Sequence, residues 1–340
     1  MSNPIEHVFV IAEAGVNHNG SIDLALDLVQ AAHASGADAV KFQTFRADLL
    51  ATPTAPKAPY QERTSPAAES QFEMLKALEL DEDSHKRLIT RCRELGIQFL
   101  SSPFDEQSAD LLAALDIPLF KVPSGEITNL PFLRHLARKS KPIILSTGMS
   151  TLGDVEEAVK VLREEGITNL TLLHCVTEYP APFAEINLRA LHTLKAAFGF
   201  PVGYSDHSPG IEIAVAAVAM GASVIEKHFT LDRSMPGPDH AASLEPRDLQ
   251  QMVSAIRNVE LALGSGIKTP ALCELPNIPV ARKSVVAART LAAGHCIKAG
   301  DLGIKRPGSG LAPKFLSTLI GHSLRKNVGK DEVITWDHLA

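Results

Sequence analysis

The sequence predicts a (β/α)8 TIM barrel followed by a small C-terminal domain, and three observations support this. Between residue 8 and about residue 265, short runs rich in Val, Ile, Leu and Phe alternate with longer amphipathic segments. The 340 residues exceed the ~250 that a single α/β barrel typically needs, which leaves room for an appendage. Hydrophobic residues make up 45% of the chain and charged residues 21%, a balance typical of a large packed core.

Eight apolar runs have the length and composition of β-strands. They occupy residues 8–13, 38–43, 97–101, 119–122, 142–146, 170–174, 202–205 and 223–228. Helical patterns between and after them include 21–35, 82–95, 107–115, 155–165, 187–197, 211–220 and 246–263. Glycines stand just after several of these patterns, where a helix needs a left-handed residue: Gly36, Gly96, Gly166, Gly199 and Gly221.

A doubly wound open sheet is the alternative fold for such a pattern. That fold usually carries a Gly-rich phosphate loop after its first strand, and residues 14–20 (AGVNHNG) do not match GxGxxG. The barrel is therefore favoured.

We assign residues 1–268 to the barrel, residues 269–281 to a linker and residues 282–340 to the second domain. The linker contains Pro270, Pro276 and Pro279 without a helical period, which indicates a semi-rigid connection. The second domain shows short strands at 284–287, 302–305 and 333–334 and one helical pattern at 314–319. So small a module has a thin core and is expected to lean on another surface.

Charge and hydropathy exclude two function classes. The net charge is −6 and no long Lys/Arg run is present, so the chain lacks the footprint of a nucleic-acid binder. No apolar stretch reaches the ~20 residues that span a bilayer, and the N-terminus has no basic region or cleavage site. We expect a cytoplasmic protein with no membrane partner.

The four cysteines, Cys92, Cys175, Cys273 and Cys296, show no CxxC spacing. Because cytosolic proteins rarely form disulfides, we expect each as a small core residue. His174 and Cys175 are neighbours, but neighbours in a strand face opposite sides and are poorly placed to share one metal ion.

Polar side chains are concentrated where the predicted strands end, which in this fold is where active sites lie. The ends carry Glu13, Asn17 and His18; Lys41 and Gln43; Lys121, Ser124 and Glu126; Ser146 and Thr147; Ser205, Asp206 and His207; and Glu226, Lys227 and His228. Alternation places Lys41 with Gln43, Ser205 with His207, and Glu226 with His228 on common faces. One such residue alone would be read as a satisfied buried polar group, but burying the whole set requires a ligand or a metal.

Two kinds of site follow from these residue types. His207 and His228, at the ends of adjacent strands, are suited to bind one divalent cation with open positions for water and substrate. Lys121, Ser124 and Ser146 offer a cation and hydroxyl donors for an oxyanion. Nearby Gly125, Gly148 and Gly203 either admit backbone N–H groups to that anion or serve as turn glycines.

Two further segments allow more than one interpretation. Residues 233–243 (RSMPGPDHAAS) form either a rigid loop presenting Asp239 and His240 over the barrel mouth or a surface turn. Arg306, in KRPGSG, is by itself a solvated charge at a strand end.

In order and spacing, several segments resemble the nonulosonic (sialic) acid synthase family: IAEAGVNHNG, KFQT, SSPFD, KVPSGE, ILSTGMS, LLHCVTEYPAPF, GYSDHS and IEKHFTLD. The closing RKSVVAARTLAAG and IKRPGSG resemble the antifreeze-like, or SAF, domain of that family. The resemblance covers nearly the whole chain. It implies a TIM barrel followed by a SAF domain.

The resemblance also implies a reaction. Members of the family, such as N-acetylneuraminate synthases, condense phosphoenolpyruvate with the open-chain aldehyde of an N-acetylated hexosamine, releasing phosphate and giving a nine-carbon α-keto acid. By this resemblance, His207 and His228 bind Mn²⁺ or Mg²⁺, which polarises the aldehyde oxygen. Glu13 positions or deprotonates water, while Lys121, Ser124, Ser146 and Ser205 hold phosphoenolpyruvate.

Other positions match the family's sugar contacts, namely Lys41, Gln43, Glu126, Tyr179 and Asp239. Thr177 stands where some sialic acid synthases have Asn, and Pro123 stands where some relatives have Gly. We carry over a substrate contact for Thr177. In this family the C-terminal domain reaches the partner subunit, so Arg306 is expected to close the partner's site in a domain-swapped homodimer.

Three alternatives remain open at this point. The acceptor is N-acetylmannosamine, or 2,4-diacetamido-2,4,6-trideoxymannose as in an N,N'-diacetyllegionaminate synthase, and residues 52–68 are expected to help decide which. A deoxy-octulosonate phosphate synthase would need an arginine cluster and lacks a SAF-like segment. A non-catalytic sugar-binding protein would have no reason to keep both a metal pair and an anion site.

Overall fold

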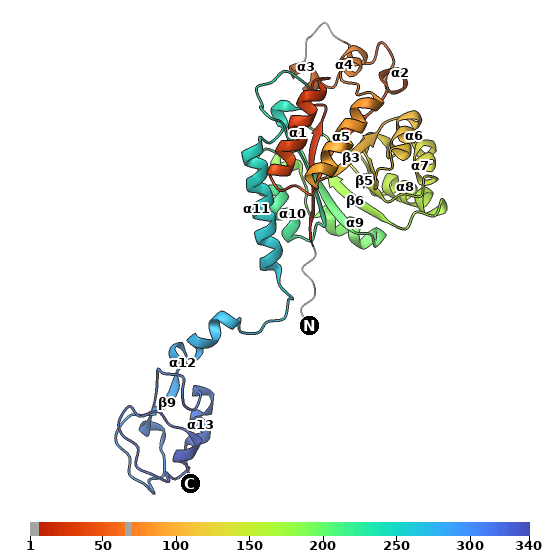
Figure 1. The fold of residues 1–340 in the computed structure, drawn as a ribbon. Helices are drawn as coiled ribbons and strands as arrows, with labels where there is room; N and C mark the ends of the chain where they lie inside the picture. Colours follow the sequence, from red (N-terminus) through yellow and green to blue (C-terminus); the bar gives the residue numbers. More distant parts are fainter. Residues whose placement is uncertain (1–6, 65–69) are drawn as a thin grey trace. The chain divides into compact units, whose positions relative to one another are not determined.

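The computed structural model describes residues 7–64 and 70–340, and the chain divides into two compact units, Met1–Ser265 and Gly266–Ala340. The first unit is a closed barrel of parallel strands surrounded by helices (Figure 1). The second is a small unit built around an antiparallel strand pair. The predicted fold class is confirmed.

The barrel strands lie in the order β3-β2-β1-β8-β7-β6-β5-β4. β3 and β4, at the two ends of this order, also lie beside each other, so the sheet closes on itself. The strands are β1 (Phe9–Gly15), β2 (Ala39–Thr44), β3 (Gln98–Pro103), β4 (Phe120–Val122), β5 (Ile143–Ser146), β6 (Leu170–Cys175), β7 (Val202–Asp206) and β8 (Val224–His228). Each predicted barrel strand is present, and its ends differ from the prediction by at most two residues.

The outer helices bury one apolar face each against the strands. They are α1 (Ile22–Ala34), α5 (Glu82–Leu95), α6 (Glu106–Ala114), α7 (Leu130–Ala137), α8 (Leu152–Glu164), α9 (Ala190–Phe198), α10 (Glu212–Ala219) and α11 (Pro246–Leu263). The side chain of Ser21 caps α1 by accepting from the N–H of Leu24. Gly96 ends α5 in the left-handed conformation, at φ 75°.

The barrel interior is layered. Ile11, Ala39, Leu100, Ile144, Leu173 and Val224 form an apolar cluster inside the barrel. Two residues further along the same strands come Glu13, Lys41, Ser102, Ser146, Cys175 and Glu226, all of which line one cavity. Because strand side chains alternate, the apolar layer closes the bottom of the barrel and the polar layer forms the floor of a site above it.

Three short helices between β2 and α5 were not resolved by sequence periodicity. These are α2 (Ala47–Leu50), α3 (Pro59–Thr64) and α4 (Gln71–Ala77). They are too short to show a 3.6-residue pattern, although Ser70 and Glu73 form a capping box at the start of α4. Residues 65–68 of the predicted acceptor loop lie outside the described residues.

The second unit pairs β9 (Ser284–Ala287) with β10 (Leu302–Lys305) and includes α12 (Ile278–Ala281) and α13 (Leu316–Leu319). A small cluster that includes Val285, Leu291, Leu319 and Val328 forms its core. The prediction of a strand at residues 333–334 is wrong, since Val333 makes only an isolated bridge with Val286.

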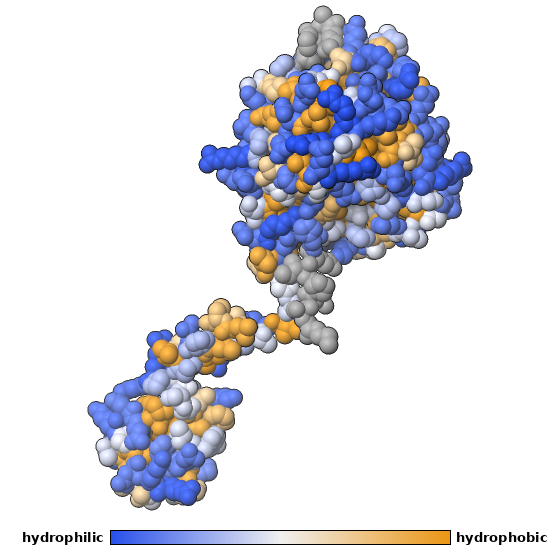
Figure 2. Space-filling model, viewed as in Figure 1, coloured by the Kyte–Doolittle hydropathy of each residue, from blue (hydrophilic) through white to orange (hydrophobic). Residues whose placement is uncertain are grey.

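The proline-containing linker differs from expectation. It carries a 3-10 helix, Leu272–Asn277, directly before α12. Pro279 lies in the first turn of α12, where a helix tolerates proline. Its apolar side chains are exposed, among them Leu272 at 86% and Val280 at 68%. Figure 2 shows orange, apolar surface along this segment.

Two of the four cysteines are buried and two are exposed. Cys92 and Cys175 are buried, but Cys273 and Cys296 are exposed, so the prediction of four core cysteines is wrong for the second unit, whose core is too small to enclose them.

Among residues 7–64 and 70–340, no helix has both the length and the apolar character that a membrane span requires.

Candidate active site

A cavity of about 430 Å³ opens at the carboxyl ends of the barrel strands. Twelve of the predicted site residues line it: Glu13, Lys41, Gln43, Lys121, Ser124, Ser146, Thr177, Tyr179, Ser205, His207, His228 and Asp239. They come from seven of the eight strands or from the loops that follow them. Closure of the barrel thus brings together side chains more than 200 residues apart in the sequence.

Two predicted residues are not part of this lining. Glu126 lies next to the cavity residue Gly125, but its carboxylate accepts from the side chain of Asn129 at 2.7 Å. Burial raises the pKa of Glu126. Arg306 belongs to the second unit, where its Nε donates to the carbonyl oxygen of Ala281 at 3.0 Å.

Two buried lysines and two buried carboxylates form the floor of the cavity. Lys41 Nζ lies 2.6 Å from Glu13 Oε2, and Lys121 Nζ lies 3.0 Å from Glu226 Oε1. Lys41 also lies 3.9 Å from Glu226 Oε2, which links the two pairs. None of the four side chains is more than 4% exposed.

Glu226 shares a strand face with His228, but we assigned it no role from sequence. The sequence signal that could have identified Glu226 was its position two residues before His228.

The two carboxylates of this network have opposite pKa shifts. Burial raises the pKa of Glu13 because its single close cation, Lys41, offsets only part of the desolvation cost. Burial also opposes ionisation of Glu226, but the ammonium groups of Lys121 and Lys41 outweigh it and lower the pKa. Glu226 therefore serves as a fixed anion, whereas Glu13 is suited to take up and release a proton.

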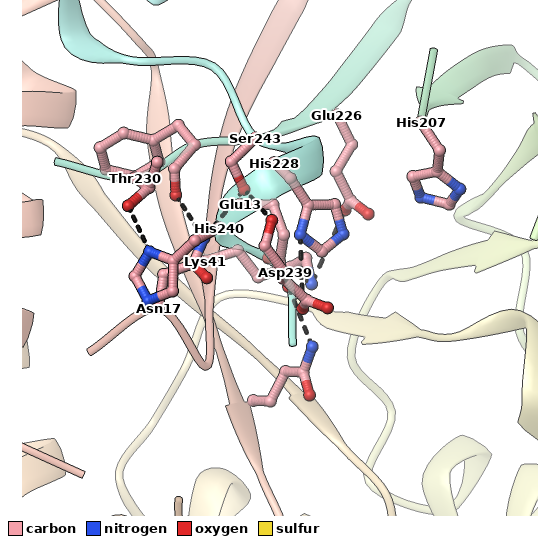
Figure 3. Close-up of polar contacts among 12 residues, drawn as sticks. Glu13, Asn17, Lys41, His207, Glu226, His228, Thr230, Asp239, His240 and Ser243 are labelled. Carbon is pink, nitrogen blue, oxygen red and sulfur yellow. Dashed lines mark hydrogen bonds and ion pairs between the residues drawn. The ribbon is translucent and has the colours of Figure 1, made fainter. Parts of the chain in front are cut away.

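The two predicted metal ligands converge, as Figure 3 shows. Their ring centroids are 5.4 Å apart, and Tyr179 packs against both rings, at 4.2 Å from His207 and 5.5 Å from His228. Burial lowers the pKa of His207 to about 4 and that of His228 well below its usual value. Both imidazoles are therefore neutral near pH 7, the form that binds metals.

Hydrogen bonding fixes which nitrogen of His207 is free. Its Nδ1 lies 2.6 Å from the carbonyl oxygen of Val176, which can only accept, so Nδ1 carries the proton. The lone pair of the neutral ring is then on Nε2. Asp239 Oδ2 lies 3.7 Å from Nδ1 of His228, a buried nitrogen with no hydrogen-bond partner.

These features fit a divalent cation. Within the described residues, no three His, Cys, Asp or Glu side chains form a ready-made metal cluster. Two neutral imidazoles, one with an unpartnered buried nitrogen, nevertheless supply a donor pair. A site of this kind would keep its other positions open to water and substrate oxygens.

The cavity also offers hydroxyl donors. Ser146 Oγ and Thr177 Oγ1 are buried and have no hydrogen-bond partner, which is costly unless a ligand is bound. The N–H of Gly148 donates to Ser124 Oγ at 2.9 Å. A Cβ at Gly148 would clash with the side chains of Ser124, Cys175 and Thr177, so glycine is required there.

Gly203 has a different role from Gly148. A Cβ there would meet the backbone oxygen of Val224 and the side chain of Leu173, so it allows close packing inside the barrel. Gly203 does not line the cavity, and the anion-binding reading of this glycine is wrong.

The loop after β8 turns one of its two candidate residues into the site. Asp239 lines the cavity, whereas His240 points away and lies within hydrogen-bond distance of Thr230 Oγ1, at 2.6 Å (Figure 3). Asn17 ties this loop to β1 by donating to Ser243 Oγ at 2.9 Å. Asn17 and His18 are buried but do not line the cavity.

The alternate residues on β7 and β8 face away from the cavity. Asp206 and Lys227 form a fully buried ion pair, 2.8 Å between Oδ2 and Nζ. Asp206 also accepts from the N–H of Ser208 at 2.9 Å. This pair holds the turn that carries His207, and it explains two charges that the sequence left without a role.

The cavity is lined partly by residues that the sequence analysis did not identify. Ser102 and Cys175 belong to the floor, and apolar residues from α2 and α4 form a wall. Ser102 was detectable by its strand-end position, but the apolar wall had no sequence signal because apolar residues in short helices look like ordinary core.

The sequence matches the model of the NeuB family over residues 28–268 and that of the SAF domain over residues 282–340. It is 51% identical to N,N'-diacetyllegionaminic acid synthase of Campylobacter jejuni, covering 97% of this chain and 99% of that protein. It is 48% identical to the protein of the same name from Legionella pneumophila, covering 97% and 94%. Among solved structures, a sialic acid synthetase from Leptospira borgpetersenii superposes with a TM-score of 0.71 at 35% identity, covering 81% of this chain and 91% of that one. The chain belongs to the NeuB family and ends in a SAF domain.

Proposed function

We propose that this protein is a nonulosonic acid synthase that condenses phosphoenolpyruvate with an open-chain N-acetylated hexosamine and water, giving a nine-carbon α-keto sugar acid and phosphate. The observation that carries the proposal is one cavity that holds two distinct sets of groups. Lys121 and the hydroxyl of Ser146 suit an anion, and the imidazoles of His207 and His228 suit a metal-bound aldehyde.

For the acceptor we favour 2,4-diacetamido-2,4,6-trideoxymannose, which would make the product N,N'-diacetyllegionaminic acid. Support comes from the two relatives of that name, at 51% and 48% identity over nearly the whole chain. N-acetylmannosamine is the second candidate, supported by the 35% identity to a sialic acid synthetase.

His207 and His228 would hold Mn²⁺ or Mg²⁺, and the bound cation would act as a Lewis acid on the aldehyde. Lys121, Ser124, Ser146 and Ser205 would bind phosphoenolpyruvate, with Lys121 contributing the positive charge. Lys41, Gln43, Thr177, Tyr179 and Asp239 would contact the sugar, and Glu126 would reach it from beside the cavity.

The bonds made and broken follow from these positions. C3 of phosphoenolpyruvate forms a bond to the aldehyde carbon, which leaves an alkoxide on the aldehyde oxygen and a positive charge at C2. Water adds to C2, and Glu13 accepts its proton, a role that its raised pKa favours. That proton converts the alkoxide to a hydroxyl. The C2–O bond to phosphate then breaks, the new C2 hydroxyl loses its proton to the departing phosphate, and the keto acid remains.

A direct test incubates the metal-stripped chain with phosphoenolpyruvate and each acceptor, with and without Mn²⁺. We expect phosphate release only with an acceptor and metal present, with the diacetamido sugar preferred. In ¹⁸O-labelled water the released phosphate should carry no label, because the C–O bond breaks. Acceptor-independent phosphate release, or labelled phosphate, would contradict the proposed function.

A further inference from the structure

One wall of the cavity has a composition unlike the rest. Its floor is made of charged and hydroxyl side chains from the strands, but the residues contributed by the segment between β2 and α5 are apolar or amide-bearing. The apolar wall consists of Val16, Leu50, Met74, Leu75, Leu78 and Phe104.

The wall is a packed structure of its own. Val16, Met74 and Leu78 are buried in a cluster separate from the main barrel core. Leu50, Leu75 and Phe104 pack against that cluster and remain partly exposed. The wall therefore presents a preformed apolar surface to the cavity rather than loose side chains.

Among residues 45–59, 61–62 and 70–80, no charged side chain lines the cavity. The polar groups there are the amides of Gln61 and Gln71, whose side chains approach each other to 3.4 Å. A phosphate on the acceptor would call for Arg or Lys at this wall, and a free hydroxyl would be buried against apolar carbon.

We infer that this wall, above all Leu50 and Leu75, sets acceptor specificity by contacting the deoxygenated C6 methyl end of the sugar. The inference rests on the proposed function, which places the aldehyde at His207 and His228 on the floor. The far end of a six-carbon sugar in the same cavity then lies against residues that are not on the floor. A methyl group gains from contact with Leu50 and Leu75, whereas the C6 hydroxyl of N-acetylmannosamine would lose hydrogen bonds to water that these two side chains cannot replace.

The variants are Leu75→Gln and, independently, Leu50→Gln, which keep side-chain length but place an amide at the wall. Leu49→Gln is the matched control. Leu49 lies beside Leu50 on α2, is 46% exposed and does not line the cavity. Three acceptors separate the chemistry: the diacetamido trideoxy sugar, N-acetylmannosamine and 6-deoxy-N-acetylmannosamine. The readout is kcat/KM for each acceptor from phosphate release at saturating phosphoenolpyruvate.

We expect Leu75→Gln and Leu50→Gln each to lower kcat/KM for both 6-deoxy acceptors by roughly 10-fold or more. The value for N-acetylmannosamine should change by no more than about twofold, and so should the KM for phosphoenolpyruvate. Leu49→Gln should behave as the unmodified chain. Thermal melting checks that the variants are folded, and the second variant keeps the test valid if one is not.

Failure of the wall assignment and failure of the synthase function give different results. If the unmodified chain uses the acceptors but neither wall variant changes their ratio, the wall assignment is overturned and the synthase function stands. The same holds if Leu49→Gln shifts the ratio equally. If the unmodified chain uses none of the three acceptors, both the function and the wall assignment are overturned.

Discussion

At the scale of single residues, unpartnered buried atoms that line the cavity mark side chains that are expected to do chemistry. Most buried polar groups in proteins are hydrogen-bonded, so the unpartnered atoms of Ser146, Thr177 and His228 require an explanation. All three line the same cavity. A bound anion and a bound metal ion would satisfy them.

The histidine pair gives the first prediction. Replacing His207 or His228 with Ala should abolish turnover and weaken Mn²⁺ binding, because half of the imidazole donor set is lost. Titration calorimetry with Mn²⁺ measures binding apart from activity, and His33→Ala, an exposed site on α1, is the control. Near-normal turnover of either variant in chelating buffer would reject the metal site.

Lys121 gives the second prediction. Lys121→Ala should chiefly raise the KM for phosphoenolpyruvate, because losing a charge-assisted contact costs ~1.5–3 kcal/mol. That corresponds to roughly 10- to 150-fold. The exposed Lys160→Ala on α8 should leave KM unchanged. An unchanged KM in Lys121→Ala would place the anion elsewhere.

At the scale of elements, the register between strands decides which side chains meet. Glu13 on β1 is level with Lys41 on β2 and with His228 on β8, and Ser205 on β7 is level with Glu226. A shift of one residue would turn each of these to the opposite face. The apolar layer beneath them holds the register, since Ile11, Ala39 and Val224 would otherwise leave the barrel interior.

In the second unit, a buried carboxylate organises the turn before β10. Asp301 accepts from Nε of Arg289 at 2.9 Å and from the N–H of Lys298 at 2.9 Å, and it pairs with His295 at 2.6 Å. The hydrogen bond to His295, followed by those from Lys298 and Arg289, lowers the pKa of Asp301 below its ordinary value of 3.8.

This arrangement gives the third prediction, on stability against pH. A carboxylate with a lowered folded-state pKa stabilises the fold fully above its unfolded-state pKa, and the stabilisation is lost as pH falls through the folded-state value. Asp301→Asn should therefore destabilise the second unit at pH 7, and the difference from the unmodified chain should shrink below pH ~4.

Trp336 is the chain's single tryptophan and lies in the second unit, so urea unfolding followed by its fluorescence reports on that unit. Asp331→Asn, which removes an exposed pair with Lys305, should have a smaller effect. A destabilisation by Asp301→Asn that is equal at pH 7 and pH 3 would show that its charge is not responsible.

At the scale of the whole molecule, two features call for a partner subunit. The second unit has a small core, and the segment joining it to the barrel exposes Leu272, Leu275 and Val280. Apolar surface of this kind is typical of an interface. We propose a domain-swapped homodimer in which Arg306 completes the partner's active site.

Mixing experiments give the fourth prediction. A dimer of one Arg306→Ala chain and one His207→Ala chain would contain one site with both lesions and one site with neither. Mixing the two inactive variants should restore up to half of the activity per mixed dimer. Arg306→Lys should remain impaired, because a guanidinium binds oxygen pairs in a fork that an ammonium cannot reproduce.

The outcome without a swap is different. Each site of the mixed dimer would then carry one lesion, and the mixture would stay inactive. Sedimentation of the unmodified chain provides the necessary check on the oligomeric state. A monomeric, fully active chain would reject the cross-subunit role of Arg306 while leaving the barrel chemistry intact.

The sequence by itself determined the barrel and most of the polar residues that line its cavity. Two regularities made this possible: strand side chains alternate between faces, and parallel barrel strands all end at the same rim. Lys41, His207 and His228 could therefore be placed in one site from their positions relative to strand ends. These regularities act locally and need no knowledge of the partner strand.

Only the tertiary structure decided which side chains pair and which turn away. Lys121 meets Glu226 across 105 residues, and Asp239 enters the cavity while its neighbour His240 leaves it. Such contacts depend on how the closed barrel brings distant strands and loops together. The apolar wall of α2 and α4 likewise emerged only in three dimensions, because a leucine facing a cavity and a leucine facing the core are identical in sequence and differ only in what packs against them.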